Sequence, residues 1–83
     1  MEVKFSRHAA SQMFERKILA EWAIRAIASP EFVKDDVMDH EVKLAFCRIE
    51  EFGNRYLCVA HKPETQPVFV VTAFFDRNAE QKR

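Results

Sequence analysis

Apolar and polar positions follow a helical period in the first third of the chain. From Ser6 to Lys17 the apolar residues recur at i, i+3 and i+4, on one helix face, and Ser6 can cap this helix by accepting a free backbone N–H. A second helix is predicted from Glu21 to Ala28, and Pro30 ends it because the residue before a proline resists helical geometry. Both helices are short and need a sheet to cover their apolar faces. The predicted stripe of the first helix consists of Ala9, Ala10, Met13 and Phe14.

After Pro30 the pattern becomes that of β-strands. Segments 42–52 and 55–61 are predicted to form a long hairpin around a two-residue Gly53-Asn54 turn, which pairs Ile49 with Cys58. Segment 68–75 is apolar on both faces, as in a central strand. A chain of 83 residues has room for a single domain, residues 1–83, with one core.

The predicted hairpin register divides the residues between two faces. One face carries small side chains suited to packing under helices, namely Ala45, Cys47, Ile49, Cys58 and Ala60. The other face combines apolar with charged side chains, namely Val42, Leu44, Phe46, Leu57, Val59, Arg48, Glu50 and His61. An apolar surface with embedded charges is typical of a partner-binding or active face. The alternative is a second core layer under the C-terminal tail.

The chain has no net charge, since 13 Lys and Arg balance 13 Asp and Glu. This balance counts against strong non-specific binding to nucleic acid. Basic residues nevertheless gather near the two ends, and if the fold brings these ends together they form a small site for an anionic ligand. No run of about 18 apolar residues predicts a membrane span. The N-terminus lacks the pattern of a signal peptide, which predicts a cytoplasmic protein.

The sequence offers no metal or cofactor motif. Cys47 and Cys58 are predicted to be small buried residues, because the predicted register sets them diagonally and unfavourably for a disulfide. There is no Cys-x-x-Cys and no His-x-x-x-His, and the acidic segment near Asp36 lacks an EF-hand glycine. One glycine cannot form a glycine-rich phosphate loop. We therefore expect neither a metal nor a cofactor.

Two strings carry a resemblance to a known family. The first is Phe5-Ser6-Arg7-His8-Ala9 with Met13, Glu15-Arg16 and Ile18, and the second is Val71-Thr72-Ala73-Phe74. They resemble a family of small bacterial domains of unknown function that is related to the RelE-like and BrnT-like toxins. The resemblance spans nearly the whole chain. It implies an α+β fold of RelE/BrnT type, with two N-terminal helices packed on a curved antiparallel sheet of about four strands.

The resemblance also implies an activity. The better-known relatives are metal-independent ribonucleases of toxin–antitoxin systems, in which a small antitoxin masks the active face. Three positions depart from the family pattern: Lys17 stands where glycine is common, Gln12 where many members carry a basic residue, and Leu19-Ala20 where a Ser or Thr cap is usual. Gln12 removes one candidate phosphate contact.

Metal-independent RNA cleavage needs a base, an acid and cations for the transition-state phosphate. His8 lies near a helix N-terminus, where the dipole disfavours its charged form, and is predicted to be the base. Arg16 lies about 12 Å further along the helix axis and could flank the same phosphodiester. His61 is the candidate second acid or base, and Thr72 the candidate hydroxyl. The remaining candidate RNA contacts are Arg7, Lys17, Arg48 and Arg77.

Each of these residues also has a purely structural interpretation. His8 could bond a backbone carbonyl, Arg16 could pair with Glu21 or Asp35, and His61 could be a solvated edge residue. The leading hypothesis is a toxin-like ribonuclease that acts on RNA and is neutralised by a small partner protein. The alternative is a non-catalytic protein-interaction module on the same fold, which dimerises or assembles through the apolar hairpin face. Neutral charge favours the alternative, whereas the placement of His8 and Arg16 favours the enzyme.

Overall fold

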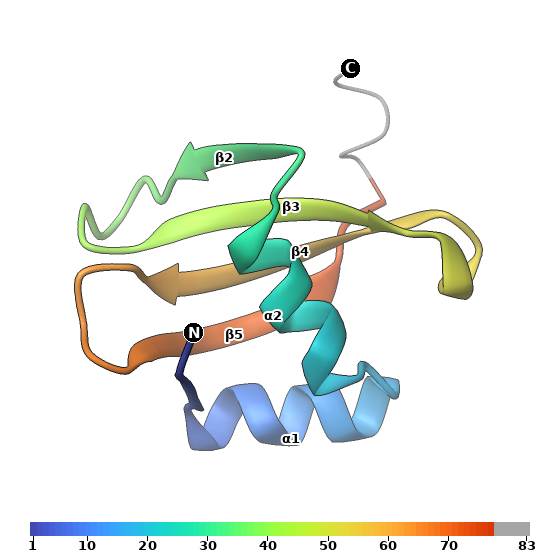
Figure 1. The fold of residues 1–83 in the computed structure, drawn as a ribbon, viewed down its shortest axis with the longest axis horizontal. Helices are drawn as coiled ribbons and strands as arrows, with labels where there is room; N and C mark the ends of the chain where they lie inside the picture. The colour runs from blue at the N-terminus through green and yellow to red at the C-terminus, as the bar shows by residue number, and fades with distance from the viewer. Residues whose placement is uncertain (78–83) are drawn as a thin grey trace.

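The computed structural model describes residues 1–77. Within them, two helices cover one face of a five-stranded sheet of order β1-β5-β4-β3-β2 (Figure 1). β1 pairs in parallel with β5, and the other neighbours are antiparallel. The predicted α+β class with two N-terminal helices is confirmed, but the sheet is mixed and has one strand more than the four expected. In chain order the elements are β1 (Val3–Phe5), α1 (Arg7–Arg16), α2 (Ala20–Ala28), β2 (Phe32–Asp35), β3 (Lys43–Ile49), the 3-10 helix η1 (Glu50–Phe52), β4 (Arg55–Lys62) and β5 (Val68–Phe75).

Ser6 joins the first strand, the first helix and the last strand. Its hydroxyl accepts a hydrogen bond from the Ala9 N–H at 2.9 Å, which is the predicted cap of α1, and donates one to the Val71 carbonyl at 2.8 Å. Its backbone N–H donates to the Val70 carbonyl at 2.9 Å. One residue therefore satisfies a free donor of the helix end and ties α1 to β5.

The main core lies between the helices and the sheet. α1 contributes Ala9 and Met13, but Ala10 is exposed and Phe14 is 86% exposed, so the predicted stripe is wrong at those two positions. The reason is the helical period: Ala9 and Met13 lie on the side of α1 that packs on β5, and Ala10 and Phe14 fall on its flank. The buried residues of this core are Ala9, Met13, Ile18, Trp22, Ala23, Ala26, Cys47, Ile49, Leu57, Val59, Val70 and Ala73.

The hairpin between β3 and β4 differs in register from the prediction. Ile49 pairs with Arg55 rather than with Cys58, because the connection spans five residues, 50–54, instead of two. Gly53 and Asn54 do adopt positive φ, at 68° and 59°. The three-residue shift is odd, so it exchanges the two faces of β4. Leu57 joins the core under the helices, and Cys58 lies on the opposite face with Phe46.

The face of the sheet away from the helices carries a second, smaller core. Phe32 stacks on Phe46 with ring centroids 4.6 Å apart, and the Lys34 ammonium lies 5.8 Å from the Phe46 centroid. Tyr56 is fully buried and donates its hydroxyl to the Glu31 carboxylate at 3.0 Å. This face was predicted to be an apolar surface with embedded charges, and several of its apolar groups are instead packed against one another.

Lys17 ends α1 in a left-handed conformation. Its φ is 59°, its N–H donates to the Phe14 carbonyl at 3.3 Å, and the Ile18 N–H donates to the Met13 carbonyl at 2.8 Å. These two bonds form a Schellman cap, in which glycine is usual because a Cβ crowds the backbone at positive φ. The position where the resembling family often has glycine is thus one where the backbone favours it.

We expect Lys17→Gly to raise the free energy of unfolding by about 0.5–1 kcal/mol, because glycine removes the steric cost of the left-handed conformation. Urea denaturation measures the difference. Lys17→Ala is the matched control, since it removes the same charge but keeps the Cβ, and its stability should stay close to that of the wild type. A glycine variant that is less stable than the alanine variant contradicts this explanation.

Candidate functional site

The end of α1, the start of β4 and the end of β5 supply the residues that line a pocket. Its volume is about 430 Å³. Three of its lining residues are arginines, one is an aspartate and three are aromatic. They are Arg16, Phe52, Arg55, Tyr56, Phe75, Asp76 and Arg77. Three guanidinium groups against one carboxylate give the lining a net positive charge, in a chain whose total charge is zero.

Three distant parts of the chain supply the arginines. Arg16 is the last residue of α1, Arg55 is the first of β4, and Arg77 follows β5 by two positions. They converge because α1 packs along β5, and β5 pairs with β4 so that the end of one strand lies beside the start of the other. The Asp76 N–H donates to the Tyr56 carbonyl at 2.9 Å and extends this pairing past the end of β5.

Aromatic rings form one wall of the pocket. Phe52 and Phe75 stack with centroids 4.7 Å apart and ring planes inclined by 11°. Trp22 of α2 supports both rings from the core side, with centroid distances of 5.9 Å and 6.4 Å. The guanidinium carbon of Arg55 lies 5.5 Å from the Phe52 centroid, within the range of a cation–π interaction. The wall therefore combines flat apolar faces with positive charge.

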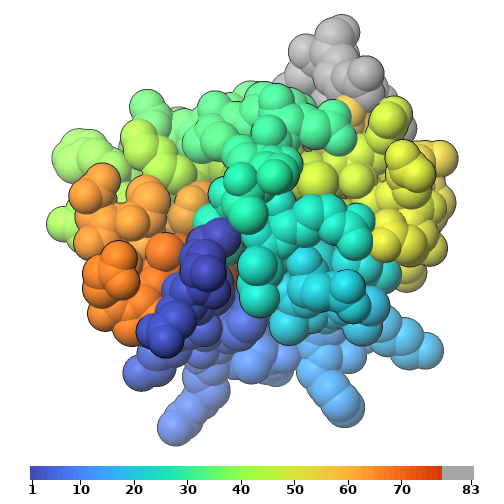
Figure 2. Space-filling view, viewed as in Figure 1, coloured from blue at the N-terminus to red at the C-terminus, as the bar shows by residue number. Residues whose placement is uncertain are grey.

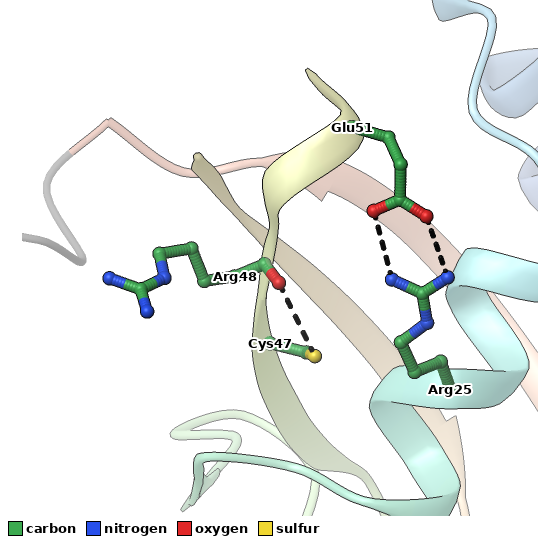
Figure 3. Close-up of polar contacts among 4 residues, drawn as sticks. All are labelled: Arg25, Cys47, Arg48 and Glu51. Carbon is green, nitrogen blue, oxygen red and sulfur yellow. Dashed lines mark hydrogen bonds and ion pairs between the residues drawn. The ribbon is translucent and has the colours of Figure 1, made fainter. Parts of the chain in front are cut away.

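An ion pair attaches η1, which carries Phe52, to α2 (Figure 3). Arg25 donates two hydrogen bonds to the Glu51 carboxylate, at 3.1 Å and 2.9 Å. These bonds lower the pKa of Glu51 to about 2, so the carboxylate stays ionised well below neutral pH. Both side chains are partly exposed, and the pair fixes the geometry of the turn more than it adds stability.

The two cysteine thiols are placed for packing and not for chemistry. Cys47 lies close to the same turn, with its Sγ 3.7 Å from the Arg48 carbonyl oxygen (Figure 3). Burial raises the pKa of Cys47 and raises that of Cys58 to about 12. A thiol with a raised pKa is protonated at neutral pH and is a poor nucleophile. The interpretation of both residues as small buried side chains agrees with this placement.

Of the residues predicted to act in chemistry, the pocket contains Arg16 and Arg77. His8 is exposed in the first turn of α1, about 12 Å along the axis from Arg16. His61 is only 5% exposed and lies six residues from Arg55, about 20 Å along β4. Its Nδ1 is 3.2 Å from the Val59 carbonyl oxygen, so the interpretation as a solvated edge residue is wrong.

The other predicted contacts are also dispersed. Thr72 is half-buried and pairs with Ala60, on the face of β5 opposite to Phe75. Arg48 is exposed on β3, where its backbone N–H donates to Glu31 at 3.0 Å. Two more predicted contacts, Arg7 and Lys17, are exposed at the two ends of α1. The structure thus brings together the arginines at the end of α1 and after β5 and leaves the two histidines outside their pocket.

Arg55 is the lining cation that sequence reasoning missed. The predicted two-residue turn placed it at the tip of the hairpin, next to Phe52. The signal for the longer connection is Phe52 itself, an aromatic residue that follows Glu50-Glu51 in an otherwise polar tip. Burial of this ring against Phe75 requires the chain to leave the strand at Ile49.

Within residues 1–77, no group of three or more His, Cys, Asp and Glu side chains is arranged to hold a metal ion. None of the helices in this part of the chain is long and apolar enough to span a membrane.

Comparison with known proteins identifies a family for the chain. No curated protein and no solved structure matches it significantly. One family model does match, and its match covers residues 5–75. This range contains both helices and all of the strands described above, apart from the first two residues of β1. The chain therefore belongs to the family described as Domain of unknown function (DUF4258).

Proposed function

We propose that the pocket binds a phosphodiester of single-stranded RNA and that the domain is a toxin-like, metal-independent ribonuclease. The observation that carries the proposal is the convergence of Arg16, Arg55 and Arg77 beside a stacked pair of aromatic rings. Guanidinium groups match the geometry and charge of phosphate oxygens. Flat aromatic faces accept stacked bases without regard to sequence. The resemblance to RelE-like and BrnT-like toxins supports the same substrate.

The lining residues suggest how cleavage proceeds. The Asp76 carboxylate accepts the proton of the ribose 2′-hydroxyl, and the 2′-oxygen attacks the adjacent phosphorus. The bond from phosphorus to the 5′-oxygen breaks, and the leaving oxygen takes a proton from water. The hydroxide so formed takes the proton held by Asp76, and the RNA is left with a cyclic phosphate and a 5′-hydroxyl. The arginines stabilise the extra negative charge on the phosphorane. His8 and His61, which lie outside the pocket, take no part in this scheme.

A small antitoxin completes the proposed system. Expression of the domain without its partner is expected to arrest growth, because free ribonuclease degrades cellular RNA. Purified protein is expected to cleave single-stranded RNA in the presence of EDTA and to leave DNA of the same sequence intact, since DNA lacks the 2′-hydroxyl. Gel analysis of the ends of the RNA fragments shows whether cleavage leaves the expected cyclic phosphate. Wild-type protein that neither arrests growth nor cleaves RNA overturns the proposal.

The second candidate function is a non-catalytic binding module on the same scaffold. The observation that favours it is the absence of a histidine among the residues that line the pocket, together with the zero net charge. The same assay separates the two functions. Cleavage of RNA in EDTA assigns the enzyme, and protein that associates with itself or with a partner but cleaves no RNA assigns the module.

A further inference from the structure

Large apolar side chains that are exposed to solvent fall into two separate groups among the described residues. One group belongs to the N-terminus and the α1 corner, where Phe14 is 86% exposed and Leu19 is 48% exposed. The other belongs to β2 and the loop that follows it, where Val37 is 95% exposed and Met38 is 88% exposed. Isolated exposed apolar residues are common, but adjacent ones at a structured position indicate a contact surface.

The loop after β2 is held in shape by its own hydrogen bonds. The Asp36 carboxylate accepts from the backbone N–H groups of Met38 and Asp39, at 3.1 Å and 3.0 Å. Asp39 in turn accepts from the Glu41 N–H at 3.0 Å, and the Asp36 N–H donates to the Val42 carbonyl at 3.2 Å. These bonds hold the segment in a turn from which Val37 and Met38 project. The apolar tip is therefore preorganised, and little conformational entropy is lost when it binds.

The two exposed groups carry opposite charge. Residues 35–42 contain four carboxylates and no Lys or Arg; Asp35 and Glu41 form ion pairs with Lys43 and Lys62, so the excess negative charge comes from Asp36 and Asp39. On α1, Arg7, Ala10 and Phe14 follow one another along one exposed flank, and Lys17 ends the helix near the same flank. Glu15 lies on the other side of the helix, so this flank is basic and apolar. We call it the α1 flank (Arg7, Ala10, Phe14, Lys17 and Leu19), and the acidic segment the β2 loop (residues 36–41).

The two surfaces are too far apart to meet within one molecule. α1 forms the lower edge of the molecule in the ribbon view, and the β2 loop lies at the upper left (Figure 1). The space-filling view shows side chains of α1 projecting away from the rest of the chain at this lower edge (Figure 2). A loop that matches the α1 flank in polarity and charge can reach it only on another copy.

We propose that the β2 loop of one copy docks on the α1 flank of a second copy of this chain. Val37 and Met38 pack against Phe14 and Leu19, and the carboxylates of the loop face the cations of α1. The contact is heterologous, because two different surfaces meet. After one contact, the first copy keeps a free α1 flank and the second a free β2 loop, so further copies can add. The two patches are small, which places the contact among weak, concentration-dependent interfaces. Neither surface includes a residue that lines the arginine pocket, so the contact does not require RNA.

Complementation between two variants tests this arrangement. The loop variant carries Val37→Ser and Met38→Ser, and the flank variant carries Arg7→Gln and Phe14→Gln. All four side chains are exposed, so both variants should fold as the wild type does. One chain has a mass of 9.8 kDa. In sedimentation velocity, the average mass of the wild-type protein should exceed this value and increase with protein concentration. Each variant alone should stay monomeric, and an equimolar mixture should form a dimer, because it restores one intact loop and one intact flank.

Three results would overturn the proposed contact. Wild-type protein that is monomeric at every concentration overturns the proposal, and so does a mixture that stays monomeric. Self-association retained by either variant alone shows an interface between identical surfaces and also overturns it. High salt should weaken the wild-type association, because it screens the charges of the two patches. Thermal unfolding of both variants checks that loss of association does not come from loss of fold.

Discussion

Replacement of Arg55 with glutamine is expected to weaken the binding of short single-stranded RNA by about 10- to 150-fold. The variant loses a hydrogen bond between two charged groups, which is worth about 1.5–3 kcal/mol. Arg16→Gln and Arg77→Gln should each have an effect of the same order, because these arginines line the same pocket. Fluorescence anisotropy with a labelled RNA measures the affinity.

Two control variants separate the pocket from the rest of the surface. Arg48→Gln removes the same charge from an exposed site outside the pocket, and we expect it to change the affinity little. His8→Ala removes the base predicted from the sequence and should also leave binding intact. If Arg48→Gln weakens binding as much as Arg55→Gln, RNA is held by diffuse charge and the pocket has no special role. If only His8→Ala weakens it, the site lies at the other end of α1.

Replacement of Trp22 with alanine is expected to lower the free energy of unfolding by about 3–5 kcal/mol. Trp22 is 6% exposed and contacts the rings of Phe52 and Phe75. A domain of this length has a total stability of about 4–12 kcal/mol, so the variant should lose at least about a quarter of it. Urea denaturation of the two proteins measures the loss.

Phe14→Ala is the matched control for Trp22→Ala. It also removes an aromatic ring from a helix, but that ring is 86% exposed, and we expect a change within about 0.5 kcal/mol. Trp22→Phe keeps most of the buried volume and should lie between the two. A loss below about 1 kcal/mol for Trp22→Ala would falsify the assignment of this ring as the support of the pocket wall.

The sequence predicts the helices of this protein well because their signals are local. Ser6 caps the first helix, Pro30 follows the second, and the period of the apolar residues locates both. Phe14 shows the limit of that reasoning. A stripe of apolar residues at helical spacing is wider than the contact that one helix makes with the sheet. The packing of α1 on β5 therefore buries only some residues of the stripe and leaves Phe14 exposed.

The candidate site could be predicted only in part. Arg16 and Arg77 lie at the ends of recognisable elements, and the meeting of the two chain ends was expected. Their meeting with Arg55 depends on the length of the hairpin connection, which the apolar alternation does not determine. His8 and His61 are plausible catalytic residues by type, but the distance between them and the pocket depends on where each lies along its element.

By itself, the sequence determined the α+β class, the N-terminal cap of the first helix and the concentration of basic residues near the two ends of the chain. Those features depend on neighbours within a few positions, where backbone geometry and side-chain period act directly. Only the tertiary structure decided the five-stranded order, the register of β3 with β4 and the arginine pocket. Each of these depends on contacts between distant residues, above all the packing of Phe52 against Trp22 and Phe75, which sets the turn and thereby the position of Arg55.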